Sequence, residues 1–402
     1  MSILTRPRPV RTRGTHHWLR PMVARNPAQE HRVSTPLELL FDLCFAVAVS
    51  QAGSQLRHSL GAGHVGQGLI GYATVFFSIW WAWVNFTWFA STYDTDDALY
   101  RLSTLVQIAG VLVLAAGVPR AFTLHDFSTV VAGYAIMRCG LVAQWLRAAH
   151  SYPSGRRTAL RYAAGVSCCW GGWAVLLLAS PPGCRLALWP LMAAAELAVP
   201  LWARRAGVSP WHPQHIAERF GLFTLIVLGE SVLASTTAVQ VAVDAPHPPL
   251  SLYCIAAGGL LTLFSMWWLY FAKPAHGFLR SNKVGFVWGY GHLFVYAGAA
   301  AVGAGLGVGV DRVKGASQLS EIAANLAFCV PVALFLLMVW VLHLRPHATG
   351  VAGNAVFPLA AAVIPFFALT GFAVLATGVL MALLVGAAVV VSFTPSDPDR
   401  PD

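Results

Sequence analysis

The stretch from Asn354 to Phe393 reads NAVFPLAAAVIPFFALTGFAVLATGVLMALLVGAAVVVSF, forty residues without one charged side chain. A single helix of that length would extend about 60 Å, twice the roughly 30 Å of a bilayer's hydrocarbon core. We therefore expect the chain to turn back near Thr370 and Gly371. The stretch then forms two membrane-spanning helices, at 354–370 and 373–393.

The composition of the whole chain agrees with this local pattern. Of its 402 residues, 57% are hydrophobic and only 10% are charged, too little polar surface to coat soluble domains of that length. The bilayer must be the solvent. The seven cysteines mostly lie inside apolar runs and show neither metal-ligand spacing nor a disulfide framework. We expect them to be packing residues, and we expect no bound cofactor or metal.

A scan for further runs of about 20 apolar residues predicts ten more spans. They lie at 36–55, 66–90, 101–118, 128–147, 162–180, 186–203, 216–240, 250–272, 285–309 and 320–343. The predicted fold is an all-α polytopic transmembrane bundle of about twelve helices.

Positive charge is distributed in a way that predicts the orientation of these helices. The net charge is +10, and seven arginines fall within the first 33 residues, a segment without the apolar core of a signal peptide. Placing this basic tail in the cytoplasm puts twenty of the 26 Lys and Arg residues on that side, as the positive-inside rule requires. Both termini are then cytoplasmic. The tail is suited to contact anionic lipid headgroups rather than nucleic acid.

A repeated motif indicates an internal duplication. FFSIWW ends at Trp81 and LFSMWW at Trp268, an offset of 187, while Asp42 and Glu230 are 188 apart. Two parallel six-helix repeats would be related by an axis along the membrane normal; alternatively, the Trp pairs mark membrane interfaces, where Trp is common. The predicted organisation is a basic tail, two repeats and a short cytoplasmic tail, at 1–33, 34–205, 206–394 and 395–402.

The informative side chains are those that ionise inside the predicted spans, where each costs about 2.5–3.5 kcal/mol near a helix centre. The deep acids are Asp42, Glu196 and Glu230, and the deep base is Arg138, which could pair with Glu196 or with Asp42. Three acids and one base favour a path for cations or protons. His292 lies on a polar and aromatic stripe of its helix, either as a proton relay or as an interhelical hydrogen-bonding group.

Other charged residues gather near the predicted cytoplasmic ends. Glu38 lies one helical turn before Asp42 and on the same face, where it could cap the helix or join a site. The segment YDTDDALYR is either functional or a solvated loop that caps the third span. The pair at the start of the seventh span is either functional or a helix cap. These residues are Asp94, Asp96, Asp97 and Arg101, and Glu218 with Arg219 at the membrane surface.

Five blocks of the sequence together resemble the bacterial low temperature requirement A family. They are ELLFDLCFAVAVSQ at 38–51, YDTDD at 93–97, AERFGLFTLIVLGES at 217–231, WWLYF at 267–271 and GYGHLFVYAGAAAVGAGL at 289–306. The resemblance implies a multi-pass protein of the bacterial inner membrane. The motif positions it covers are Glu38, Asp42, Asp94, Asp97, Glu218, Arg219, Glu230 and His292. Ala272 departs from the pattern, because an acid is expected after WWLYF.

Three functions remain open on these residues. The leading hypothesis is a secondary transporter or cation/proton-conducting protein with Asp42 and Glu230 as a paired midplane site. The second is an intramembrane or lipid-modifying enzyme with a metal site made by Glu38 and the acids of YDTDD, although no soluble-enzyme motif is present. The third is a non-catalytic membrane-adaptation component whose internal charges tie helices together.

Overall fold

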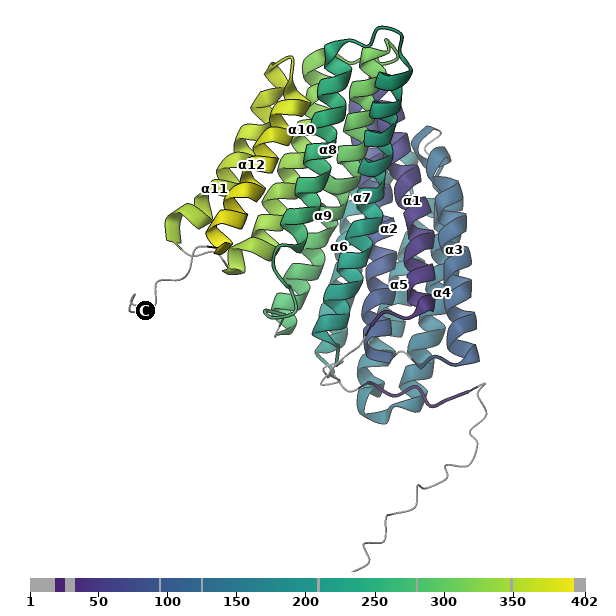
Figure 1. Ribbon diagram of the computed structural model, residues 1–402. Coiled ribbons are helices and arrows are strands. Elements are labelled where there is room, and N and C mark those ends of the chain that lie inside the picture. Colours follow the sequence, from purple (N-terminus) through teal and green to yellow (C-terminus); the bar gives the residue numbers. More distant parts are fainter. Residues whose placement is uncertain are drawn as a thin grey trace, which may run out of the picture. The chain divides into compact units, whose positions relative to one another are not determined.

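The structure is a computed structural model that describes residues 19–25, 33–93, 95–123, 126–207, 210–279, 281–347 and 350–393. Within these ranges the chain forms twelve α-helices and no strand (Figure 1). The helices are α1 (Pro36–Gly61), α2 (Val65–Tyr93), α3 (Ala98–Thr123), α4 (Ser128–Ser151), α5 (Arg156–Ala179), α6 (Pro182–Arg204), α7 (Pro213–Asp244), α8 (Leu250–Phe271), α9 (Asn282–Val313), α10 (Glu321–Val339), α11 (Gly350–Val363) and α12 (Ala373–Phe393).

The predicted polytopic helical bundle is confirmed. Among the described residues, eleven helices are long and apolar enough to cross a membrane, and α11 with the 3₁₀ turn Ile364–Leu369 forms a shorter apolar segment. The forty-residue apolar stretch breaks where its length required a break. Thr370 takes an extended conformation, and α12 begins three residues later.

Several helices begin at residues whose side chains satisfy the free backbone N–H groups of the first turn. Thr35 and Glu38 form a reciprocal capping box at the start of α1, where Pro36 holds the first helical position. Ser281 and Ser320 accept hydrogen bonds from the first turns of α9 and α10 in the same way. The sequence therefore specifies these starts locally.

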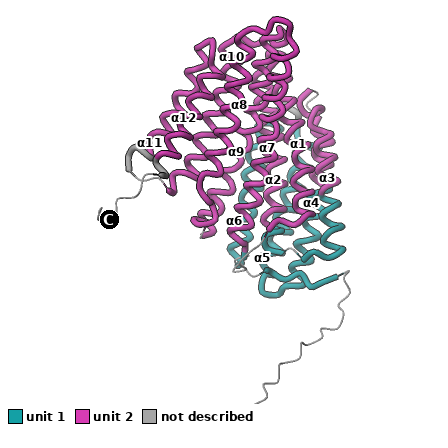
Figure 2. The backbone as a smooth tube through the Cα atoms, viewed as in Figure 1, with its two compact units in different colours: residues 1–26, 89–107, 136–210 teal, residues 27–88, 108–135, 211–402 magenta. Residues whose placement is uncertain are grey.

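The chain divides into two compact units, which are described separately (Figure 2). Unit 1 comprises residues 1–26, 89–107 and 136–210, and unit 2 comprises 27–88, 108–135 and 211–402. The predicted halves at 34–205 and 206–394 have other boundaries, and the six-helix repeat stays a prediction. In unit 1, α5 packs against α6 around Val166, Cys169 and Val199.

In unit 2, α9 packs against α1, α7, α8 and α10, while α8 packs against α12. Glycines allow the close approach of α9 to two of these neighbours. A Cβ atom added at Gly303 would lie 2.8 Å from the backbone of Glu230, and one at Gly305 would lie 2.1 Å from the carbonyl oxygen of Ala327. The small-residue pattern of α9 is thus a packing surface.

Candidate functional site

Four ionisable side chains meet inside unit 2, near the N-terminal ends of α1 and α7. Glu38 and Asp42 project from α1, and His215 and Arg219 project from α7; each is at most 1% exposed. The members of each pair are four residues apart, so they lie on one face of their helix. We call these four residues the charge cluster.

Arg219 is the centre of the charge cluster. Its Nη1 lies 3.0 Å from Glu38 Oε1, and its Nη2 and Nε donate to the two oxygens of Asp42 at 2.5 and 3.1 Å. This two-pronged contact uses the planar fork of the guanidinium. Trp83 Nε1 of α2 also donates to Asp42 Oδ1 at 2.7 Å. Asp42 is therefore held by three N–H groups from two helices.

Glu38 fulfils both roles that its position in the sequence left open. Its Oε2 accepts from the backbone N–H of Thr35 at 2.8 Å, which caps α1. Its Oε1 lies 3.1 Å from His215 Nε2 and also contacts Arg219. Oε2 also lies 3.4 Å from His215 Nε2, so the oxygen that caps the helix reaches the charge cluster as well.

The formal charges of the four residues in the charge cluster sum to zero only when one proton is added to them. Among the described residues it contains two carboxylates and one guanidinium, a net charge of −1 with neutral His215 and of zero with His215 protonated. Buried charges are costly unless they are paired and hydrogen-bonded. Gain or loss of one proton by these four residues would change their net charge by one unit.

The structure does not bring Asp42 and Glu230 together at one site. Glu230 is half-buried on α7, its backbone against Gly303 of α9. Ser50 of α1 lies within hydrogen-bonding reach of its carboxylate, and a Cβ atom at Gly53 would lie 3.4 Å from its Oε2. Ser50 is eight residues beyond Asp42, about 12 Å along the helix. The two acids occupy separate levels of the α1–α7 contact.

Comparison with known proteins agrees with the sequence blocks and this architecture. Residues 33–392 match the sequence model described as bacterial low temperature requirement A protein (LtrA). The chain belongs to this family. A protein of Rhizobium meliloti (strain 1021), described as uncharacterized, is 28% identical over 302 residues, which covers 70% of this chain and 69% of that protein. All residues of the charge cluster lie inside the LtrA match.

In this LtrA chain the second buried ion pair lies in unit 1. Arg138 Nη2 of α4 donates to Glu196 Oε2 of α6 at 3.1 Å, and the two side chains are 4% and 1% exposed. Arg138 therefore pairs with Glu196, the first of the two partners that its position left open. The pair joins two helices of unit 1.

The acidic segment before α3 of the LtrA chain is mainly a cap and an anchor. Asp97 is buried, accepts from the backbone N–H groups of Tyr100 and Arg20 at 2.8 and 2.7 Å, and forms an ion pair with Arg147. Burial alone would raise the pKa of Asp97, but the hydrogen bonds from Arg147 and the two backbone groups lower it below its usual value.

The other acids of this segment differ from Asp97. Asp96 is exposed and bonds to Arg101 at 2.7 Å, which lowers its pKa. Asp94 lies outside the described residues. Asp96 and Asp97 are thus both paired with arginines, and the described residues that are exposed to solvent here include Asp96 and Arg101.

Glu218 and Arg219, near the start of α7, lie in different environments. Glu218 accepts a hydrogen bond from the backbone N–H of Ser34 at 3.0 Å and is half-buried. Arg219 was expected beside it at the membrane surface, but this side chain is 0% exposed. Successive helical residues point about 100° apart, so one of the pair faces inward and pairs with the acids of α1.

Sequence reasoning missed His215, Trp83 and His343. A signal for His215 was present: Pro36, Glu38 and Asp42 have the same spacing as Pro213, His215 and Arg219, so an acidic and a basic pair follow equivalent helix starts. His292 is buried beside His343, with 3.3 Å between their Nε2 atoms. His343 lies on the π-helical turn Trp340–Leu344, and turns of this kind are frequent at functional sites.

Proposed function

We propose that this multi-pass membrane protein of the LtrA family is a secondary transporter or a cation/proton-conducting protein. Its working groups are the charge cluster and Glu230, with a proton or a small cation as the transported species. The observation that carries the proposal is the burial of Glu38, Asp42, His215 and Arg219 at 0–1% exposure. Ionisable side chains within transmembrane segments are rare and typically mark ion pathways or proton relays, because each is expensive to place there.

The charge cluster has the properties of a proton-binding site. His215 Nε2 lies 3.1 Å from Glu38 Oε1 and 3.4 Å from its Oε2, so a proton on the imidazole would have the Glu38 carboxylate beside it. Loss of that proton leaves the four residues of the charge cluster with a formal charge of −1, which would attract a cation or another proton. Asp42 stays fixed by Arg219 and Trp83. The histidine and Glu38 therefore form the exchangeable part, and Asp42 and Arg219 form the fixed part.

Glu230 supplies an acidic group farther along the same helix contact. It lies 17 residues from the start of α7, about 26 Å along a helix of 32 residues. Among the described residues, its neighbours are Ser50, Gly53 and Tyr72 rather than a basic side chain. A path along α1 and α7 would thus pass from the charge cluster to a carboxylate near the middle of the membrane. In this proposal the protein lies in the bacterial inner membrane with both termini cytoplasmic.

Reconstituted proton and cation flux tests this proposal. Purified protein is reconstituted into liposomes that contain a pH dye or a K⁺ or Na⁺ indicator. The variants are Asp42→Asn and Glu230→Gln. Glu321→Gln is the matched control, because Glu321 is an exposed acid, 57% accessible, at the start of α10. We expect flux in the parent and the control and its loss in both site variants. Unchanged flux in both site variants would contradict the proposal.

A non-catalytic role, with the internal charges as ties between helices, is favoured by one observation. The buried Arg138–Glu196 ion pair joins α4 to α6. If ties were the whole function, neutralising Asp42 would lower stability and change no flux. Thermal unfolding in detergent, measured on the same variants, separates the two roles.

The enzyme alternative with an acidic metal site has less support. Among the described residues, no three His, Cys, Asp or Glu side chains are grouped as metal ligands. Glu38 and Asp97 direct their oxygens to N–H donors, in unit 2 and unit 1 respectively.

A further inference from the structure

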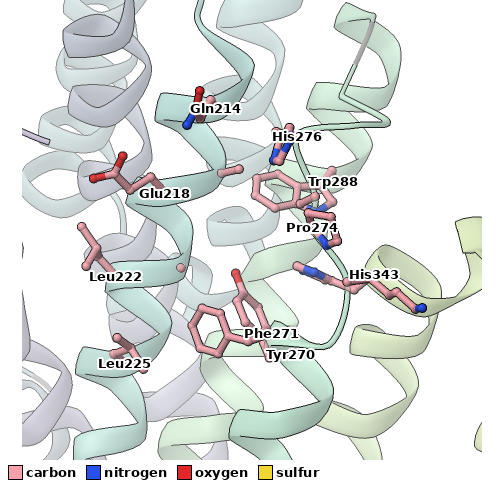
Figure 3. A pocket seen from close by; sticks show the side chains of 14 residues that line it. Gln214, Glu218, Leu222, Leu225, Tyr270, Phe271, Pro274, His276, Trp288 and His343 are labelled. Carbon is pink, nitrogen blue, oxygen red and sulfur yellow. The ribbon is translucent and has the colours of Figure 1, made fainter. Parts of the chain in front are cut away.

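A pocket of about 370 Å³ opens in unit 2 beside the buried histidine pair (Figure 3). One wall is α7, and the other includes Tyr270 at the end of α8, Trp288 of α9 and His343 of the π-helical turn. The pocket thus connects the outside of unit 2 to side chains that are 2–3% exposed.

His292 is fully buried and contacts two side chains that line this pocket, Tyr270 and His343, and all three residues carry atoms that bind metals. His292 Nε2 lies 3.3 Å from His343 Nε2 and 3.0 Å from the hydroxyl oxygen of Tyr270. Zinc–nitrogen bonds of about 2.0–2.1 Å in tetrahedral geometry separate two ligand atoms by roughly 3.3 Å. We propose that His292, His343 and Tyr270 form a binding site for a divalent transition-metal ion of the zinc and cobalt class, reached through the pocket.

The hydrogen bonds around His292 prepare it as a ligand. Its Nδ1 lies 2.7 Å from the carbonyl oxygen of Trp288, so Nδ1 carries the proton and donates it. Nε2 then presents its lone pair toward His343 and Tyr270. Metal-binding histidines are typically held by such a hydrogen bond from the other ring nitrogen, which fixes both tautomer and ring orientation. Imidazole nitrogen also suits zinc and its neighbours better than it suits Mg²⁺ or Ca²⁺.

The pocket also provides for a fourth ligand. Trp288 is 2% exposed and lines the pocket, and its indole N–H has no hydrogen-bond partner among the described residues. A ligand atom bound in the pocket within reach of Trp288 would accept from that N–H. Three protein ligands with one open position form the usual arrangement of zinc sites that exchange ligands.

A hydrogen bond between the two histidines is the competing arrangement. In that case His292 Nε2 accepts a hydrogen bond from the Tyr270 hydroxyl at 3.0 Å or from a proton on His343 Nε2 at 3.3 Å. This arrangement needs no ion and predicts no metal affinity beyond that of exposed histidines. Metal binding therefore distinguishes the two directly.

The test uses full-length protein without a polyhistidine tag, in detergent, titrated with Zn²⁺ or Co²⁺ after chelator treatment. We expect one tightly bound equivalent, a tetrahedral Co²⁺ absorption spectrum, and a loss of affinity greater than about tenfold in His292→Gln and His343→Gln. His276→Gln is the matched control, because His276 lines the same pocket but is exposed; it should retain the site.

Two outcomes would overturn the metal site. One is a parent protein that binds no stoichiometric metal, and the other is binding that persists in both histidine variants. Tyr270→Phe removes only a hydroxyl group and should change the Co²⁺ spectrum, so it serves if a histidine variant fails to fold. These readouts measure no flux. The metal site and the transport proposal can therefore fail independently.

Discussion

Replacing Arg219 by glutamine removes the guanidinium that joins Glu38 and Asp42. The variant loses one contact of 3.0 Å to Glu38 and two of 2.5 and 3.1 Å to Asp42, all in a region with side chains 0–1% exposed. Two buried carboxylates then remain without their shared cation. Removing one partner of a buried ion pair typically costs about 3–5 kcal/mol, and here one cation serves two acids.

The assay is unfolding of the purified protein in detergent, followed by tryptophan fluorescence or by loss of the monodisperse peak on heating. We expect Arg219→Gln to lose at least about 3 kcal/mol of unfolding free energy. The double variant Arg219→Gln/Asp42→Asn removes one stranded carboxylate and should recover part of that loss, which a double-mutant cycle measures as coupling. Stability of Arg219→Gln within about 0.5 kcal/mol of the parent, the range of ordinary surface changes, would refute this account of the charge cluster.

Three further predictions concern other contacts. Because its hydrogen bonds hold the pKa of Asp97 low, the stability that Asp97 contributes is present above the usual carboxylate pKa and is lost as the pH falls; Asp97→Asn should remove this acid-dependent part from a series of melts between pH 7 and pH 3. Gly303→Ala should cost about 1–3 kcal/mol in thermal unfolding, since its Cβ atom would lie 2.8 Å from the Glu230 backbone, whereas Gly309→Ala, with its nearest atom at 3.7 Å, should be near neutral. Arg138→Met should lose about 3–5 kcal/mol of unfolding free energy, and the double variant Arg138→Met/Glu196→Leu should recover most of it. An equal loss in the single and the double variant would contradict a role of this ion pair as a tie between helices.

The fold was predictable because membrane helices are specified by local quantities. The length of the apolar run from Asn354 to Phe393 and the roughly 30 Å of hydrocarbon are enough to require the break at Thr370. Likewise, the capping box at Thr35 and Glu38 is readable within four residues. Such features need no knowledge of which helix packs against which.

The partners in the site depend on helix pairing, which the sequence pattern left open. Aligning the two acids Asp42 and Glu230 suggested that they meet, yet the α1–α7 contact places Arg219 against Asp42 and Glu230 against Ser50. Asp42 is buried, whereas Glu230 is half-buried. Their register along the helix contact follows from packing among several helices, including the close approach allowed by the glycines of α9.

His343 illustrates a second limit. Its approach to His292 arises on the π-helical turn Trp340–Leu344, where the backbone departs from the 3.6-residue period. A scan based on regular helical spacing assigns a residue at such a turn to the wrong face. The histidine pair is therefore a property of the tertiary structure.

The measurement that tests the central claim most directly is flux and stability of Asp42→Asn in one preparation. Asparagine keeps an oxygen that can accept from Trp83, and Glu38 with Arg219 remains a neutral pair, so the variant should fold. We predict a melting temperature close to that of the parent together with loss of proton or cation flux in liposomes. Full flux in the variant, or a loss of flux that merely follows a loss of folded protein, would contradict a working role for the charge cluster.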